Sequence, residues 1–208
     1  MRKKIIQIAL LHLSLVLFSA CTQRRNFFED SDDPGLSRLT SRGYDIVTLY
    51  LNDSAYINPY EHHYLGGSSN SKVAVEKIPT NSDKDTLSIS WEIHYAAETD
   101  PTVGFYDLSL LIPVPKTFNQ NDFQVWEGKR LPYDVPLNVT LRLNRSNSSF
   151  NAPDTGAASI YFLKISPREN QNSTGTYLFS GIFEGSAGNN RVTKGRFDFF
   201  VDKGSLNF

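Results

Sequence analysis

The chain has 208 residues, of which 39% are hydrophobic and 21% charged, and its 21 basic and 22 acidic residues give a net charge of −1. The basic residues form no clustered stripe of the kind that follows a phosphate backbone, which excludes nucleic acid as a partner. Cys21 is the single cysteine, so a disulfide framework is excluded and the fold must be held by core packing.

The first twenty residues have the order of a secretory signal peptide. Basic residues at positions 2–4 are followed by the apolar run 5–17 and by the small residues Ser19 and Ala20. The apolar run is shorter than the ~20 residues that a membrane-spanning helix needs, which makes a retained anchor helix the weaker interpretation.

Residues 18–21, Phe-Ser-Ala-Cys, resemble the lipobox of bacterial lipoproteins. The resemblance implies a signal peptide over 1–20, cleavage before Cys21 and a diacylglyceryl (palmitate-type) lipid on that cysteine, which would hold the protein to a membrane of the cell envelope. The alternative for Cys21 is a buried free thiol. Removing the signal peptide leaves 18 basic and 22 acidic residues.

Residues 21–42 are polar and contain the acidic cluster Glu29, Asp30, Asp32 and Asp33. Such a segment buries too little apolar surface to offset its ordering entropy, so we expect a flexible tether between Cys21 and a single domain over 43–208. A calcium loop is the alternative, but the EF-hand spacing and its distant glutamate are absent.

From residue 43 onward, apolar and polar residues alternate, as in strands with one buried and one wet face. In 86–95 the pattern predicts a buried Trp91 and an exposed His94. Strands are predicted at 44–51, 86–95, 105–112, 137–143, 159–165, 176–183 and 196–201. Residues 159–165 are apolar on both faces, which predicts a central strand.

Turn-forming clusters such as Thr80-Asn81-Ser82-Asp83 separate these strands. Many short strands with such breaks predict an all-β fold: an antiparallel β-sandwich, with a β-barrel as the alternative. In the last two strands, Gly181 is expected to leave room for a neighbouring ring or backbone, and Gly195 to mark a bulge or a positive φ.

Two segments resemble uncharacterised lipoproteins of Bacteroidota. Residues 177–186, YLFSGIFEGS, followed by 192–198, VTKGRFD, are similar to their closing hairpin, in which a GxFxG strand precedes one that begins with Gly, a basic or polar residue, and Phe. Residues 44–53, YDIVTLYLND, followed by Ala55-Tyr56, are similar to their opening hairpin. The resemblance implies a β-sandwich on a periplasmic or surface-facing lipoprotein, with the outer membrane favoured, and brings no catalytic residues.

Motifs for metal binding and catalysis are weak. In Glu61-His62-His63, adjacent side chains of an extended segment point to opposite sides, so the two histidines do not readily share an ion. Ser68 and Ser186 lack the G-x-S-x-G pattern of a nucleophile elbow. We therefore expect no catalytic residue, no metal site and no cofactor. A carboxylate pair assembled by the fold would support the alternative, a secreted hydrolase.

Aromatic residues in the predicted loops are the candidate ligand-binding residues. Tyr56, Tyr60 and Tyr64 lie in a segment rich in Asn, His and Gly, and Trp126 precedes the polar residues 127–130. Rigid rings with an apolar face and a polar edge suit sugar and protein ligands, although such rings also cover the ends of sandwiches. The expectation is a non-catalytic envelope lipoprotein that binds a glycan or a protein partner.

Overall fold

The structure is a computed structural model that describes residues 29–43, 45–58, 73–96, 105–145, 152–168, 176–202 and 206. The predicted signal peptide, the predicted lipidation site Cys21 and the candidate residues Tyr60 and Tyr64 lie outside these ranges. Within them, no helix is both long enough and apolar enough to cross a membrane.

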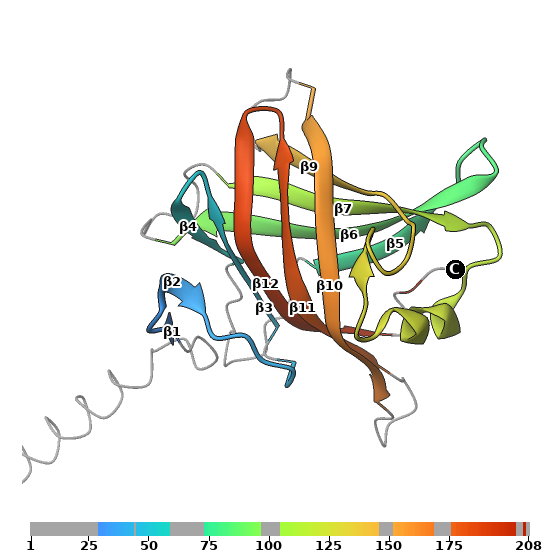
Figure 1. The fold of residues 1–208 in the computed structure, drawn as a ribbon, viewed down its shortest axis with the longest axis horizontal. Helices are drawn as coiled ribbons and strands as arrows, with labels where there is room; N and C mark the ends of the chain where they lie inside the picture. The colour runs from blue at the N-terminus through green and yellow to red at the C-terminus, as the bar shows by residue number, and fades with distance from the viewer. Residues whose placement is uncertain are drawn as a thin grey trace, which may run out of the picture.

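Eight antiparallel strands form a closed β-barrel (Figure 1). Their order is β11-β12-β3-β4-β6-β7-β9-β10, and β10 pairs with β11 along most of its length, which closes the sheet. The strands are β3 (Ile46–Leu51), β4 (Ser54–Ile57), β6 (Lys84–Tyr95), β7 (Tyr106–Pro115), β9 (Val139–Arg145), β10 (Asp154–Arg168), β11 (Thr176–Ala187) and β12 (Asn190–Asp202).

The remaining elements lie around this barrel. Strand β5 (Val73–Ile78) pairs with β6, and β8 (Arg130–Leu131) pairs with β10. The 3₁₀ helix η2 (Gln120–Trp126) lies at one end, and β1 (Glu29–Asp30) and β2 (Asp33–Ser37) form a separate hairpin. In Figure 1 the layer β10–β12 crosses the layer β5–β7 steeply, as in orthogonally packed sheets.

The all-β prediction is confirmed, and the architecture is the barrel alternative instead of an open sandwich. Alternation of apolar and polar residues is the same in both architectures. What differs is whether the first and last strands in the sheet order pair with each other, and that long-range pairing has no periodic signature. All seven predicted strands are present, whereas β1, β2, β4, β5 and β8 are additional.

Aromatic side chains fill the barrel interior. Trp91 is buried as predicted, and its ring stacks on that of Phe183 with centroids 5.5 Å apart. Phe197 and Phe199 lie 6.0 Å from the Trp91 ring. Gly181 has the close neighbours expected of it, because a Cβ there would lie 2.1 Å from the Tyr161 carbonyl oxygen. The interior is a packed core.

A bulge in β12 sets which side chains face outward. The register against β3 shifts between Thr193 and Arg196, and the positive φ lies at Lys194 (50°) and not at Gly195. Val192 and Phe197 both face the core although they are an odd number of positions apart, because the bulge adds one residue. Gly195 is required instead for space, since a Cβ would lie 2.7 Å from the ring of Phe183.

Residues 29–42, expected as part of the flexible tether, are folded against the barrel, so that prediction is wrong for them. The Leu36 side chain is fully buried, and the Ser37 hydroxyl lies 3.1 Å from the hydroxyl of Thr48 on β3. The composition of a short window misses this docking because the partners lie elsewhere in the sequence. The folded domain therefore includes residues before position 43.

The segment that links this hairpin to β3 is fixed by one buried carboxylate. Asp198 of β12 accepts hydrogen bonds from the backbone N–H groups of Arg42 and Gly43, at 3.1 and 2.7 Å, and from the Thr40 hydroxyl. Asp198 lies 155 positions beyond Gly43 in sequence. The acceptor that orders this segment is therefore supplied by the last strand of the barrel.

Candidate ligand-binding groove

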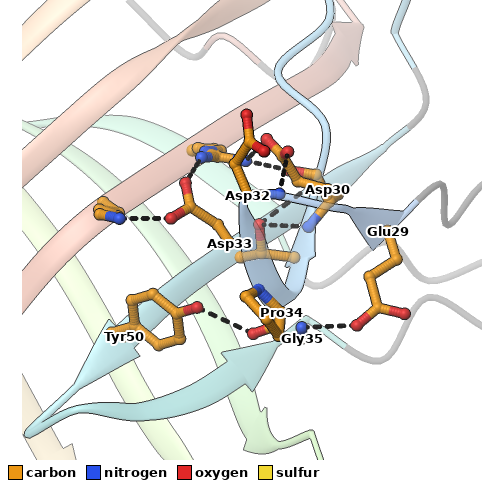
Figure 2. A network of polar contacts seen from close by, with 11 residues as sticks. Glu29, Asp30, Asp32, Asp33, Pro34, Gly35 and Tyr50 are labelled. Atoms are coloured by element: carbon orange, nitrogen blue, oxygen red, sulfur yellow. Dashed lines mark hydrogen bonds and ion pairs between the residues drawn. The ribbon is translucent and has the colours of Figure 1, made fainter.

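Two cations of β12 hold the β1–β2 hairpin to the barrel (Figure 2). Arg196 Nη1 donates to Asp30 Oδ2 and to the Ser37 carbonyl oxygen, both at 2.7 Å, and Nη2 donates to Asp33. Lys194 Nζ donates to the other carboxylate oxygen of Asp33. We refer to Asp30, Asp33, Lys194 and Arg196 as the clasp.

The hairpin's own sequence shapes it for this contact, as Figure 2 shows. The Asp32 N–H donates to Asp30 Oδ1 at 3.1 Å, and the Gly35 N–H donates to Glu29 Oε1 at 2.8 Å. Gly35 adopts a φ of +80°, and a Cβ there would lie 2.8 Å from the Cβ of Ala55. Only glycine satisfies both the backbone conformation and the close packing at this position.

The clasp contacts favour the charged forms of Asp30 and Lys194. The backbone N–H of Asp32 and the guanidinium of Arg196 hold the pKa of Asp30 below its ordinary 3.8. The hydrogen bond to Asp33, together with the charge of that carboxylate, raises the pKa of Lys194 above its ordinary 10.5. Both Asp30 and Lys194 are therefore ionised at neutral pH. Asp30 accepts a hydrogen bond from Arg196 and Lys194 donates one to Asp33, so both residues are engaged within the clasp.

A groove of about 380 Å³ lies beside the clasp, on the outer face of β10, β11 and β12. Four of its side chains form a row of cross-strand neighbours, in which Arg130 lies opposite Tyr161, Tyr161 opposite Ile182, and Ile182 opposite Arg196. The row therefore runs from a guanidinium on β8, over a ring and an aliphatic side chain, to the clasp.

The polar side chains at the end of the groove away from the clasp form only long contacts with one another. Arg130 Nη1 lies 4.0 Å from Glu184 Oε1, with side-chain exposures of 41% and 63%. The Ser159 hydroxyl donates to the same Glu184 oxygen at 3.5 Å. An exposed ion pair at this distance contributes little to stability, so these three groups can exchange their contacts for those of a ligand.

Trp126, predicted as a ligand-binding residue in a loop, is a core residue, and that prediction is wrong. Its side chain is 3% exposed, and its ring stacks on those of Phe162 and Phe118, with centroids 5.6 and 5.1 Å apart. The helix η2 causes this burial, since it turns both Phe123 and Trp126 inward to cover one end of the barrel.

Tyr56 is the described member of the tyrosine group predicted to bind a ligand. It lies on β4, opposite Tyr95 at the end of β6. It is half-buried, and its ring centroid lies 5.7 Å from that of Tyr95 and 5.8 Å from that of Tyr106. Burial raises the pKa of the Tyr56 hydroxyl. The rings are tilted or edge-on to one another, so they pack against each other instead of forming a flat surface on which a ligand could stack. Ligand binding by Tyr56 stays a prediction.

His94 is buried, so its predicted exposure is wrong. It is 8% exposed, its Nε2 lies 2.8 Å from Glu92 Oε1, and its ring stacks on Phe105 with centroids 5.2 Å apart. The pair lies where the partner of β6 changes from β5 to β4, and there Asn58 Nδ2 donates to the Glu92 carbonyl oxygen at 2.9 Å. Strand alternation does not detect such a junction.

The groove residues Tyr161 and Ile182 were not predicted as a site. The sequence did carry one signal for Tyr161, because residues 159–165 are apolar on both faces. That pattern favours a strand buried on both sides, but in the barrel the outer face of β10 is the floor of the groove.

The chemistry of the groove follows from its side chains alone. Neither a protein-family model, nor a curated protein, nor a solved structure gives a match to this chain. Within the part of the chain that the structure describes, no three His, Cys, Asp or Glu side chains converge as metal ligands would. The groove offers a ring face, a guanidinium, a carboxylate and a hydroxyl, which together suit a polar ligand with one apolar surface.

Proposed function

We propose that this protein is a non-catalytic lipoprotein of the cell envelope, anchored through lipid on Cys21, whose barrel binds a glycan or a protein partner in the outer groove. The observation that carries the proposal is the contrast between a barrel interior filled by aromatic rings and a groove of about 380 Å³ on the barrel's outer face. Volumes of that size are usual for ligand sites.

A glycan is favoured over a protein by the composition of the groove. Tyr161 offers a ring face, and Glu184 and Ser159 in the next cross-strand position offer acceptors and a donor for hydroxyl groups. Rings with polar neighbours suit ligands that are apolar on one face and polar at the edge. A protein partner would use the same surface through a protruding side chain.

The state of the carboxylates supports binding over hydrolysis. A catalytic acid needs a raised pKa, whereas the pKa of Asp30 is lowered, and both Asp30 and Asp33 are paired with Arg196. Glu184 is the groove carboxylate outside the clasp. A hydrolase that worked through a carboxylate pair would have to release one clasp carboxylate from Arg196.

The envelope location is supported by the signal-peptide pattern, the lipobox-like residues before Cys21 and the resemblance to Bacteroidota lipoproteins. The experiment is metabolic labelling with an alkyne fatty acid, followed by membrane fractionation, for the native chain and for Cys21→Ser. We expect labelling and membrane retention of the native chain and loss of both in the variant. Unchanged labelling and retention in Cys21→Ser would overturn the anchor.

Binding is tested with the purified protein on an array of envelope and plant glycans. We expect Tyr161→Ala to abolish the signal, because it removes the ring from the groove floor. Tyr133→Ala is the matched control, since Tyr133 is 75% exposed and does not line the groove. If Tyr161→Ala retained every glycan and protein interaction of the native chain, the groove would not be the binding site.

A further inference from the structure

The two arginines of the groove differ in what they can offer a ligand. Arg196 is 13% exposed and donates hydrogen bonds to Asp30, Asp33 and the Ser37 carbonyl oxygen. Arg130, at the opposite end of the same row, has its Nη1 4.0 Å from Glu184 Oε1 and is 41% exposed. Arg130 can therefore turn its fork of donors to a carboxylate in the groove, whereas Arg196 is committed to the hairpin.

The neighbours of Arg130 suit the rest of a sugar ring. Tyr161 lies directly opposite it across the β8–β10 pair, and Ser159 and Glu184 occupy the next outward positions of β10 and β11. A pyranose whose carboxylate met Arg130 could lay its C–H face on Tyr161. Its hydroxyls could then donate to Glu184 and accept from Ser159.

We propose that the groove binds oligosaccharides that carry an isolated uronic acid, and that Arg130 recognises the carboxylate. This inference rests on the proposed binding function and names its ligand class. A neutral sugar seated on Tyr161 would cover Arg130 without supplying an anion, which costs desolvation that a carboxylate offsets. Lys194 and Arg196 are paired with Asp33 and Asp30, so Arg130 is the groove cation outside the clasp, and it can serve one carboxylate and not a carboxylate on every sugar.

The experiment is isothermal titration calorimetry on the full-length protein purified in detergent. The probes are neutral oligosaccharides that carry one glucuronic, galacturonic or mannuronic acid, and each is paired with its carboxyl-reduced counterpart of the same length. We expect at least one acidic probe to bind at least about tenfold more tightly than its reduced form, the usual effect of a charge-assisted contact.

Two arginine variants locate the selectivity. Arg130→Gln should remove the preference for the acidic probe, so that both forms bind alike. Arg142→Gln should keep it, because Arg142 is an exposed arginine on β9 that does not line the groove. Thermal unfolding of each variant verifies that it is folded, and Arg130 is exposed enough that we expect its replacement to leave the fold intact.

The outcomes separate this inference from the function on which it rests. Equal binding of acidic and reduced probes, abolished by Tyr161→Ala, would overturn the assignment of the carboxylate and leave the binding function standing. Binding of no probe, or full selectivity in Arg130→Gln, would also overturn the assignment. Only an array on which Tyr161→Ala changes nothing would overturn the groove itself.

Discussion

Trp91 and His94 both lie on β6, an odd number of positions apart, so their side chains point to opposite faces of the strand. Both side chains are buried. Replacing Trp91 by alanine removes the ring that stacks on Phe183, and we expect a loss of about 3–5 kcal/mol in the free energy of unfolding. His94→Ala removes the partner 2.8 Å from Glu92, and we expect a loss of about 1–3 kcal/mol. Chemical denaturation of each variant measures both values.

Glu76→Ala is the control for this pair, since Glu76 is an exposed residue on the neighbouring strand β5 and should be silent within about 0.5 kcal/mol. A silent His94→Ala would show that the Glu92–His94 contact adds nothing to stability. A greater loss for His94→Ala than for Trp91→Ala would contradict the described core.

The surroundings of Ser180 lead to a specific prediction about the stability of the protein. Among the described residues, its hydroxyl and the Trp91 Nε1 are the buried side-chain polar atoms without a hydrogen-bond partner. Ser180 is fully buried on β11, so the desolvation of its hydroxyl is uncompensated. We expect Ser180→Ala to raise the free energy of unfolding by about 1 kcal/mol, measured by denaturation. A loss of stability would mean that the hydroxyl has a partner.

At the scale of elements, the clasp gives the hairpin a defined pH range. The pKa of Asp30 is lowered, so its contribution is complete above pH 3.8 and is lost as the pH falls through the lower folded value. The pKa of Lys194 is raised, so its contribution is complete below pH 10.5 and is lost as the pH rises through the higher folded value. We expect hairpin docking to be constant from about pH 5 to pH 9.

Carbon-13 NMR of the carboxyl groups and of the lysine side chains measures this range. Arg196→Gln should undock the hairpin at neutral pH, because it removes the donor to Asp30 and to the buried Asp33. Arg191→Gln is the matched control on the same strand, since Arg191 is exposed. Undocking of the native chain between pH 5 and pH 9 would contradict the clasp.

A second element-scale feature is the protection of the β10 edge that faces away from β11. Beyond Phe162 this edge has no strand partner among the described residues. Glu127 Oε2 accepts from the Ile165 N–H at 3.0 Å, and Pro167 has no N–H to offer. An exposed edge N–H is a template for pairing with another chain.

We expect Glu127→Ala to promote concentration-dependent self-association, because it frees the Ile165 N–H. Glu127→Gln retains an acceptor oxygen and should remain like the native protein. Size-exclusion chromatography with light scattering distinguishes the two. Identical behaviour of both variants at every concentration would show that the edge is protected by something other than this carboxylate.

The helices and strands also show which features of the fold could be predicted from the sequence. Alternation places Leu87, Ile89 and Trp91 on the correct face of β6, because one buried face leaves a period of two in any sheet. It fails at His94, where a change of strand partner buries the outer face. Composition fails for 29–42 because the cations and the carboxylate that order the segment lie on β12.

At the scale of the whole molecule, β11 and β12 are required to close the barrel. A fragment that ends at Gly175 lacks both strands, and with them the rings of Phe183, Phe197 and Phe199 that surround Trp91. It also lacks the β12 side chains that hold the hairpin. We expect this fragment to be insoluble when expressed, in contrast to the full chain.

Sedimentation of the expressed fragment and circular dichroism of any soluble part measure this outcome. A soluble fragment ending at Gly175 with a cooperative unfolding transition would contradict a single barrel and would make the last hairpin an appendage. The sheet order could not be predicted, because the pairings of β10 with β11 and of β12 with β3 join segments that share no periodic signal.

Docking of the hairpin also limits how far the groove can lie from Cys21, the residue proposed to carry the lipid. Asp30 lines the groove and is nine residues from Cys21, which spans at most about 30 Å of extended chain. A tether that ran undocked to Gly43 would span about 75 Å. If Cys21 carries the proposed lipid, the clasp would hold the Asp30 end of the groove within a layer about one bilayer core in depth above the membrane surface. Ligands displayed in that layer would then be within reach of the Asp30 end, and those held farther out would not.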